Sequence, residues 1–182
     1  MQTRIISFRG DILPLKNVLY RLALRITLSH EDAEDVVQDT MMKLWNKRDE
    51  WPTIDNIAAF ATTVCRNLAL DKVKSASTAM TAPLDDNYPR QGDGAGAKHP
   101  LAAGLSPYEQ TAQRDRVDMV RRMVDSLPEK QRSCIQLRDF EGMSYKEIAT
   151  ILSISEEQVK VNIFRARQTI KKKFSEVEEY GL

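Results

Sequence analysis

Apolar side chains recur three or four positions apart along most of this chain, which predicts amphipathic helices rather than strands. The first helix is expected to begin after Asp11, with Pro14 in its first turn, where a missing N–H costs little. A second helix begins at Ser29, and a third at Asp55 or Asn56, after a Trp-Pro break. Their apolar stripes consist of Leu15, Val18, Leu19, Leu22, Ala23 and Ile26, of Ala33, Val37, Thr40, Met41 and Leu44, and of Ile57, Phe60, Ala61, Val64 and Leu68.

The middle of the chain has a different composition. Residues 76–105 contain four of the seven glycines and three of the seven prolines, with no Ile, Val, Phe or Trp. Such a segment cannot bury enough apolar surface to offset the entropy lost on ordering, which predicts a flexible tether. The two ends of a free coil of this length would lie ~30 Å apart on average, and a fully stretched one would reach ~100 Å. Two domains joined by this tether could therefore sit two turns of DNA apart, which is ~70 Å. The predicted organisation is a small helical domain over 1–75, the tether, a second domain over 106–175, and an acidic, frayed tail over 176–182.

The second half of the chain predicts four more helices. One begins at Ser106, with Pro107 at the first helical position and Glu109 completing a capping box. Another is expected to start within Ser126–Glu129 and to end at Gly142, which adopts a left-handed conformation at little cost. Their apolar positions are Val117, Val120, Met123 and Val124 in the first, and Cys134, Ile135, Leu137 and Phe140 in the second.

The last two helices lie within Gly142–Lys173. Ser144 with Glu147, and Ser155 with Gln158, each fit a capping box, and a three-residue turn separates the two helices. The apolar sides consist of Ile148, Ala149, Ile151 and Leu152 in the first helix, and of Val159, Ile163, Ala166 and Ile170 in the second. The opposite face of the second helix carries Glu157, Val161, Phe164, Arg165, Gln168 and Lys172, flanked by Lys160 and Lys171.

This pair of helices is typical of a helix-turn-helix, whose second helix can lie in the major groove of DNA. The second helix is basic, with six Lys/Arg and no acid over residues 158–174. An ordinary αα-hairpin with a solvated basic face is the alternative interpretation. The rest of the chain has to decide between them.

Charge is segregated along the chain, although the net charge is only +1. Residues 26–42 hold five acids and no Lys or Arg. One face of the second predicted helix carries Glu31, Asp32, Asp35, Gln38 and Asp39. This polarity indicates two partners of opposite character, although an acidic helix face can also be simply solvated.

Several classes of protein are disfavoured by the sequence. No apolar run approaches the length of a membrane span, and the N-terminus has no signal-peptide core. Cys65 and Cys134 lie far apart in helical patterns, which predicts buried thiols in a reducing cytosol, and two Cys and two His do not form a zinc motif. Without a Gly-rich phosphate loop or a nucleophile–base arrangement, we expect no cofactor, no metal and no catalytic residue.

Taken in order, the motifs resemble one family. The segments YRLALRIT, DAEDVVQDTMMKLW, CRNLALDKVKS, LPEKQRSCIQLRDFEGMSYKEIATIL and VKVNIFRARQTIKKK are similar to sigma factors of bacterial RNA polymerase. The similarity is to the short extracytoplasmic-function branch, which keeps only sigma domains 2 and 4. It covers nearly the whole chain outside the tether and tail, and implies an all-α fold of two small helical domains.

The resemblance implies cytoplasmic partners and a role for each face. The partners are core RNA polymerase, through its β′ clamp helices and β flap, double-stranded and melted promoter DNA, and an anti-sigma factor that is often membrane-anchored in this family. The implied core-binding residues are Asp32, Asp35, Gln38 and Asp39. The implied minus-10 residues, which recognise and open the promoter, are Trp51, Arg66, Asn67, Asp71, Lys72 and Lys74. The implied minus-35 residues are Arg138, Tyr145, Lys160, Val161, Phe164, Arg165, Gln168 and Lys171.

The resemblance also implies a mechanism. Each domain alone offers few phosphate contacts, which salt weakens. Core polymerase would fix the separation of the domains and convert two weak DNA readers into one strong one by effective concentration. The alternative from a different class is a polymerase-independent helix-turn-helix regulator, which could not start transcription with purified core enzyme.

Overall fold

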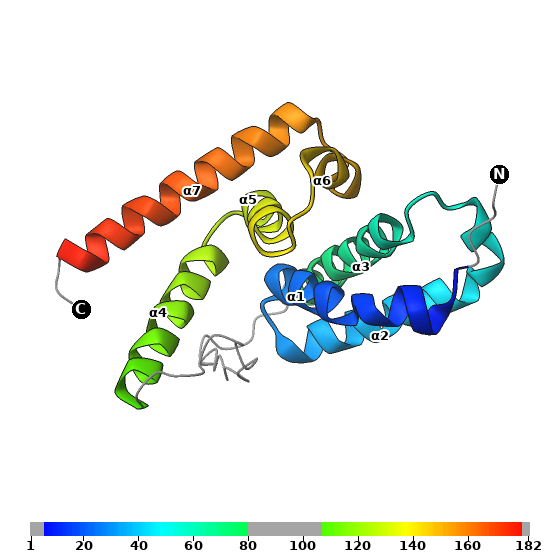
Figure 1. Ribbon diagram of the computed structural model, residues 1–182, viewed down its shortest axis with the longest axis horizontal. Helices are drawn as coiled ribbons and strands as arrows, with labels where there is room; N and C mark the ends of the chain where they lie inside the picture. Colours follow the sequence, from blue (N-terminus) through cyan, green and yellow to red (C-terminus); the bar gives the residue numbers. More distant parts are fainter. Residues whose placement is uncertain (1–5, 80–106, 180–182) are drawn as a thin grey trace.

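The computed structural model describes residues 6–79 and 107–179 of the chain. These residues form helices and no strand, which confirms the predicted all-α fold (Figure 1). The first domain consists of α1 (Lys16–Thr27), α2 (His30–Asn46) and α3 (Ile57–Ala79), which pack against one another. The second consists of α4 (Pro107–Asp125), α5 (Glu129–Ile135), α6 (Tyr145–Leu152) and α7 (Glu156–Glu179).

The start of the first domain differs from the prediction. Ser7, not Asp11, caps the first turn: its hydroxyl accepts the Gly10 N–H at 3.0 Å, and Asp11 Oδ2 accepts the Ser7 N–H at 2.8 Å. A π-helical turn, η1 (Phe8–Ile12), and a 3₁₀ turn, η2 (Leu13–Leu15), therefore precede α1. Asp11 is engaged at the end of a preceding turn, which spacing alone does not reveal.

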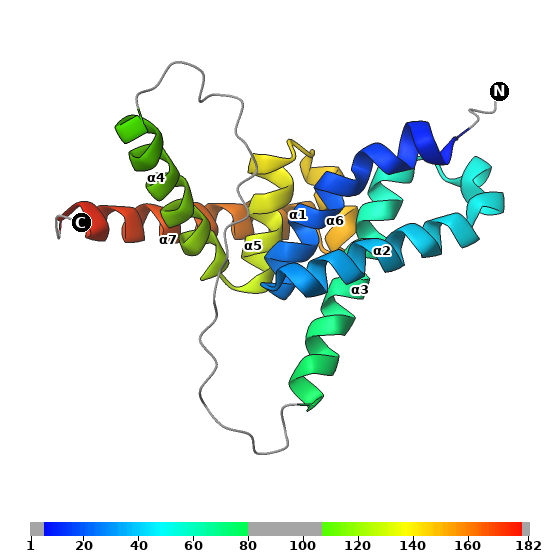
Figure 2. The same ribbon diagram turned by 90° about the horizontal axis from the view of Figure 1, so that it is seen from below.

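The other caps of the first domain follow the sequence. Ser29 accepts the Asp32 N–H at 3.2 Å to start α2, and Asn56, the second of the two predicted candidates, accepts the Ala59 N–H at 3.0 Å to start α3. Between them lies a 3₁₀ segment, η3 (Arg48–Thr53). α3 continues to Ala79, so the first residues assigned to the tether are helical. Its last turns project away from the bundle (Figure 2).

In the second domain, α4 begins at Pro107 as predicted, and α5 begins at Glu129. Ser126 does not cap α5, because its hydroxyl donates back to the Met123 carbonyl at 2.7 Å. α5 continues into a π-helical turn, η5 (Gln136–Phe140), and Gly142 follows with the predicted positive φ of 70°.

The helix-turn-helix is built as predicted from its two serine caps. Ser144 and Glu147 form a complete capping box at α6, and Gln158 exchanges two hydrogen bonds with Ser155 at the start of α7. The predicted apolar stripe of α7 lies inward, with Val159, Ile163 and Ala166 buried. α7 reaches Glu179, so the first part of the predicted frayed tail is helical instead.

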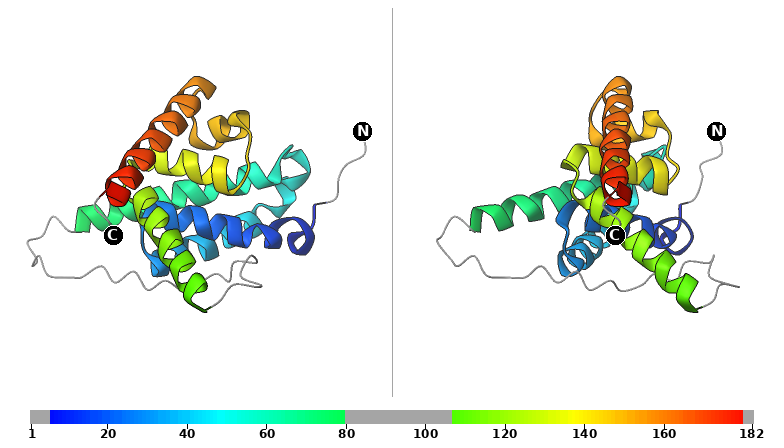
Figure 3. Two further views of the ribbon diagram at one scale, coloured as in Figure 1. Left: turned by 60° about the vertical axis from the view of Figure 1, so that its left-hand side comes forward. Right: turned by 90° about the vertical axis from the view of Figure 1, so that its left-hand side faces the viewer.

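The two domains contact each other. α5 packs against α1, and α6 packs against α3, as the views in Figure 3 allow the reader to follow. The buried apolar residues of both domains form one continuous cluster. The tether predicted over 76–105 lies outside the described residues beyond Ala79. A mutual contact between the domains was not expected from the sequence, because it pairs helices on opposite sides of the predicted tether.

Candidate functional site

The acidic face of α2 is exposed. Asp35, Gln38 and Asp39 are exposed, and Asp32 is half-buried. On the other side of the helix, Val36, Val37 and Leu44 are buried. The 3.6-residue period therefore separates an apolar side that builds the core from a carboxylate side left for a partner.

Two apolar side chains extend this acidic face and were missed from the sequence. Met42 is 60% exposed and Trp45 is 49% exposed. At 100° per residue both fall on the side of α2 that carries Asp35 and Gln38. Their angular position relative to Asp35 on the helical wheel could have indicated this exposure. It was overlooked because apolar residues are normally expected in the core.

Trp51 lies in the core instead of on the surface. Its ring is 5% exposed, its indole N–H donates to the Leu44 carbonyl at 3.1 Å, and Phe8 stacks on it at 6.4 Å. An exposed ring is needed to stack on a DNA base. Trp51 in this position is a packing residue that fixes η3 against α2, and the role implied by the resemblance does not fit its burial.

Lys72, from the DNA-binding set implied for α3, faces α2. Its ammonium lies 3.0 Å from Asp35 and 3.6 Å from Asp32, and the hydrogen bond with Asp35 raises the pKa of Lys72. The structure thereby joins two residues of the implied polymerase site to one of the implied DNA site. Asn67, Asp71 and Lys74, also implied at the DNA site, are exposed on the same helix.

Arg66 faces the second domain. Its side chain is 12% exposed, and a terminal nitrogen lies 3.9 Å from Glu129 of α5. Its Nε is buried and has no hydrogen-bond partner among the described residues. A guanidinium in this position is not available to a DNA phosphate.

The outward face of α7 matches the prediction made from the helical wheel. Val161 and Phe164 are exposed, the latter by 63%. The polar members of that face are also exposed, namely Lys160, Arg165, Gln168 and Lys171. A large exposed aromatic ring among cations suits a surface that meets both phosphates and base edges.

Arg138 and Tyr145 hold the helix-turn-helix together. Arg138 donates to the Met143 carbonyl at 2.7 Å, and its guanidinium lies 4.7 Å from the centre of the Tyr145 ring. Nearby, Arg167 of α7 forms two hydrogen bonds to Asp139, at 2.6 and 3.2 Å. These contacts fix α7 relative to η5 and to the N-terminus of α6.

An apolar groove of about 520 Å³ lies on the inner side of α7. Its lining includes Val120 and Val124 of α4, Ile135 of α5, and Ile170 of α7. Ile170 belongs to the apolar stripe of α7, opposite the exposed basic face. Lys171 of that face also lines the groove, so the two adjoin along one helix, whereas Phe164 and Arg165 are not part of the lining.

Both cysteines are free and buried, as the sequence predicts. Burial raises the pKa of Cys65 to about 12 and that of Cys134 to about 11, so both remain thiols at neutral pH. Among residues 6–79 and 107–179, no three His, Cys, Asp or Glu side chains are arranged to hold a metal ion. Each helix of those ranges is too short or too polar to cross a membrane.

Two protein-family models match the chain. Residues 12–78 match Sigma-70 region 2, and residues 118–170 match Sigma-70, region 4. The RNA polymerase sigma-H factor of Pseudomonas aeruginosa is 30% identical over 89% of this chain and 84% of its own length. The ECF RNA polymerase sigma factor SigL of Mycobacterium tuberculosis is 30% identical over 85% of this chain and 81% of its own length. The chain belongs to the extracytoplasmic-function sigma factors.

Solved structures agree on the fold. The sigma factor RpoE, crystallised with the anti-sigma factor NepR from Bartonella quintana, has a TM-score of 0.68 at 24% identity over 91% of this chain and 94% of its own. CnrH in complex with the cytosolic domain of CnrY has a TM-score of 0.63 at 21% identity, over 92% of this chain and 87% of its own.

This sigma factor acts with RNA polymerase in promoter-specific transcription initiation. The family assignment and the matched sigma regions carry that conclusion, and they do not favour a polymerase-independent regulator.

Proposed function

We propose that separate surfaces of this sigma factor bind polymerase, the minus-10 element and the minus-35 element. The acidic face of α2 docks on the β′ clamp helices, α3 binds and opens the minus-10 element, and α7 reads the minus-35 element in the major groove. The observation that carries the assignment is the separation of charge: an exposed carboxylate face on α2, and an exposed basic face on α7 that carries Phe164.

For the polymerase contact, Asp35, Gln38 and Asp39 supply the charge, and Met42 and Trp45 supply apolar area on the same side of α2. Charge complementarity steers encounter and orientation, whereas buried aromatic area supplies most of the lasting affinity. A docking surface that combines the two suits a stable but reversible assembly.

For the minus-10 element, we assign phosphate and base contacts to Asn67, Asp71, Lys72 and Lys74 of α3. Arg66 would join them only if its contact with Glu129 were broken. Unstacking a base costs a few kcal/mol. Phosphate attraction and hydrogen bonds from α3 offset part of that cost once polymerase holds the domain in place. We leave Trp51 out of this set because its ring is buried.

For the minus-35 element, Val161 and Phe164 contact thymine methyl groups, and Arg165 and Gln168 reach base edges. Lys160 and Lys171 attract phosphates, which adds affinity independent of sequence. Arg138 and Tyr145 support the fold of the motif through their contact with each other.

The β flap of polymerase is the second proposed protein contact, in the apolar groove beneath α7. This position is supported by the apolar lining: Ile170 from the inward stripe of α7 lines the groove, whereas Val161, Phe164 and Arg165 of the proposed DNA face do not. Polymerase and DNA could then hold the second domain at the same time.

Regulation by an anti-sigma factor is proposed from the two structural neighbours, both of which were solved in complex with a protein partner. The role throughout is binding rather than catalysis. As a partner of polymerase on the chromosome, this sigma factor would act in the cytoplasm.

Transcription with purified core polymerase tests the assignment. Asp39→Lys should abolish association with core, whereas Arg165→Ala should leave association intact and reduce initiation at promoters that need a minus-35 element. Lys130→Ala, at an exposed position of α5 outside both faces, is the matched control. If Asp39→Lys assembles and initiates like the control, the assignment of α2 is wrong.

A further inference from the structure

Trp45 is a large aromatic residue at the protein surface whose ring is held by two neighbours. It is 49% exposed, and on the helical wheel it lies on the side of α2 that carries Asp35 and Gln38. The Phe8 ring meets it edge-on, with 5.3 Å between the ring centres and 87° between the planes. The Arg48 guanidinium lies 5.3 Å from the centre of the Trp45 ring. The exposed ring therefore contacts both the N-terminal turn η1 and the segment η3.

Phe8 is itself fixed to the core of the first domain. Its ring stacks on Trp51 at 6.4 Å, with 16° between the planes. Trp51 is buried, and its indole N–H donates to the Leu44 carbonyl at 3.1 Å. The turn η1, which carries Phe8, also packs against α3. A row of aromatic rings thus runs from the buried Trp51 through Phe8 to the exposed Trp45.

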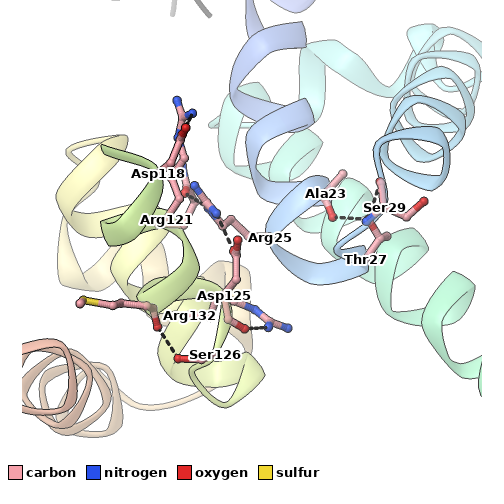
Figure 4. A network of polar contacts seen from close by, with 11 residues as sticks. Ala23, Arg25, Thr27, Ser29, Asp118, Arg121, Asp125, Ser126 and Arg132 are labelled. Carbon is pink, nitrogen blue, oxygen red and sulfur yellow. Dashed lines mark hydrogen bonds and ion pairs between the residues drawn. The ribbon is translucent and has the colours of Figure 1, made fainter. Parts of the chain in front are cut away.

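The main partner of Arg48 is Trp45. Besides covering the ring, Arg48 donates from Nη1 to the Trp45 carbonyl at 3.4 Å. Asp49 lies 4.0 Å from Arg48 and its side chain is 90% exposed, so this ion pair contributes little. By contrast, Figure 4 shows Arg25 of α1 extending to the Asp125 carboxylate, which it reaches at 2.5 Å. The guanidinium of Arg48 is left for the face of the ring, to which a cation is attracted.

We propose that Phe8 and Arg48 are positioning residues for polymerase binding: they hold the Trp45 ring in the orientation in which it meets core polymerase. The inference rests on the proposed function, which places Trp45 in the polymerase contact beside the acidic face of α2. It extends the residues that determine this contact to the N-terminal turn, because η1 supplies Phe8.

A ring that is already held in the free protein binds more tightly than a mobile one. A contact that must order a freely rotating side chain loses free energy, and this loss is avoided when the ring is fixed beforehand. An edge-to-face aromatic pair and a cation over the ring both restrict the ring without covering it. About half of Trp45 stays open to a partner while its orientation is set, which suits an aromatic anchor.

The test compares core binding and the order of the Trp45 ring in the full chain. The variants are Phe8→Leu, which keeps an apolar side chain, and Arg48→Gln, which keeps a polar one. Phe8→Tyr keeps the ring and is the conservative rescue. Arg122→Gln, at an exposed arginine of α4 in the other domain, is the matched control.

Two measurements are made on each variant. Affinity for purified core polymerase is obtained by titration. The free protein is labelled with fluorotryptophan and its fluorine NMR spectrum is recorded. Because the chain has two tryptophans, the resonance of Trp45 is the one that is lost in Trp45→Phe.

We expect Phe8→Leu and Arg48→Gln each to weaken core binding about two- to tenfold, the range for ordering one more side chain on binding. Phe8→Tyr and Arg122→Gln should bind like wild type. In the first two variants, the Trp45 resonance should move toward its position in the unfolded chain. The Trp51 resonance should stay distinct from its unfolded position, which shows that the core is intact.

A double-mutant cycle with Trp45→Ala distinguishes positioning from a general loss of stability. If Phe8 acts through Trp45, Phe8→Leu should cause no further loss of core affinity once the Trp45 ring is absent. Damage to the whole domain would instead weaken binding in the Trp45→Ala background as well. Additive losses, or wild-type core affinity in both Phe8→Leu and Arg48→Gln, would overturn the proposal.

Trp45→Ala also separates this inference from the proposed function. It should weaken core binding about tenfold or more. If it does so while Phe8→Leu and Arg48→Gln bind like wild type, the positioning role is wrong and the polymerase contact of Trp45 stands. If Trp45→Ala binds core like wild type, the contact assigned to Trp45 in the proposed function is wrong, and the inference fails with it.

Discussion

The Lys72 ammonium lies 3.0 Å from the Asp35 carboxylate, linking α3 to α2. One residue belongs to the proposed DNA site and the other to the proposed polymerase site. A polymerase that engages Asp35 would release Lys72, so docking could prepare the DNA site. Because each residue of the pair belongs to a different site, replacing one of them tests DNA binding and replacing the other tests polymerase binding.

Lys72→Ala should weaken promoter DNA binding by the polymerase complex and lower the slope of log affinity against log salt by about 0.7–0.9, the value of one phosphate contact. Binding to core should be unchanged or tighter, because Asp35 loses a competing partner. Asp35→Ala should instead weaken core binding. Arg9→Ala, at an exposed position of the same domain outside both proposed sites, is the control. Loss of core binding in Lys72→Ala would contradict the assignment.

Phe164 provides a prediction about base readout. Replacing minus-35 thymines by uracil removes only a methyl group, and should reduce wild-type initiation by about fourfold for each methyl that Phe164 contacts, or about 0.8 kcal/mol. Phe164→Ala should be slower on thymine templates and insensitive to the replacement. Uracil at thymines outside the element is the matched control on the DNA. Equal sensitivity of wild type and variant would exclude a methyl contact by Phe164.

Gly142 is expected to determine the stability of the second domain through its backbone. Its φ is +70°, and a Cβ there would meet no atom within 4 Å. Gly142→Ala should therefore lower the free energy of unfolding by the cost of a left-handed residue alone, about 1–2 kcal/mol, and Gly142→Asn by less. Urea unfolding of the full chain measures both, and an unchanged stability for Gly142→Ala would contradict this.

Cys65 makes stability depend on pH at the alkaline end. Its folded pKa of about 12 lies above its ordinary value of about 9, so the folded state binds the proton more tightly. The contribution is complete below pH 9 and is lost as the pH rises toward 12. The stability difference between wild type and Cys65→Ala should therefore shrink over that range. A constant difference would mean that the thiol ionises equally in both states.

Local features of the fold could be predicted from the sequence. The caps at Ser29, Asn56 and Ser144, and the left-handed Gly142, depend on residues a few positions apart, and the structure has all of them. The Asp11 cap failed because Ser7 competes for the same turn. Local rules rank candidates correctly only when a single candidate is within reach.

In the candidate site, too, features set within one helix could be predicted and features set by contacts between elements could not. The outward face of α7 was predicted from one helical period, because a helix that buries Val159 and Ile163 must expose Phe164. Trp51 could not be placed, since its burial depends on Phe8 and on a carbonyl of α2.

The helical pattern, most helix caps and the acidic and basic faces of this sigma factor follow from the order of its residues. Helical spacing and capping depend on residues a few positions apart within one helix, so they can be predicted from the local sequence. The contacts of Arg21, Arg25 and Arg66 with carboxylates of the other domain, and of Lys72 with Asp35, could be seen only in the folded chain. The physical reason is that these pairs join side chains 37 to 120 positions apart, whose encounter depends on how whole helices pack.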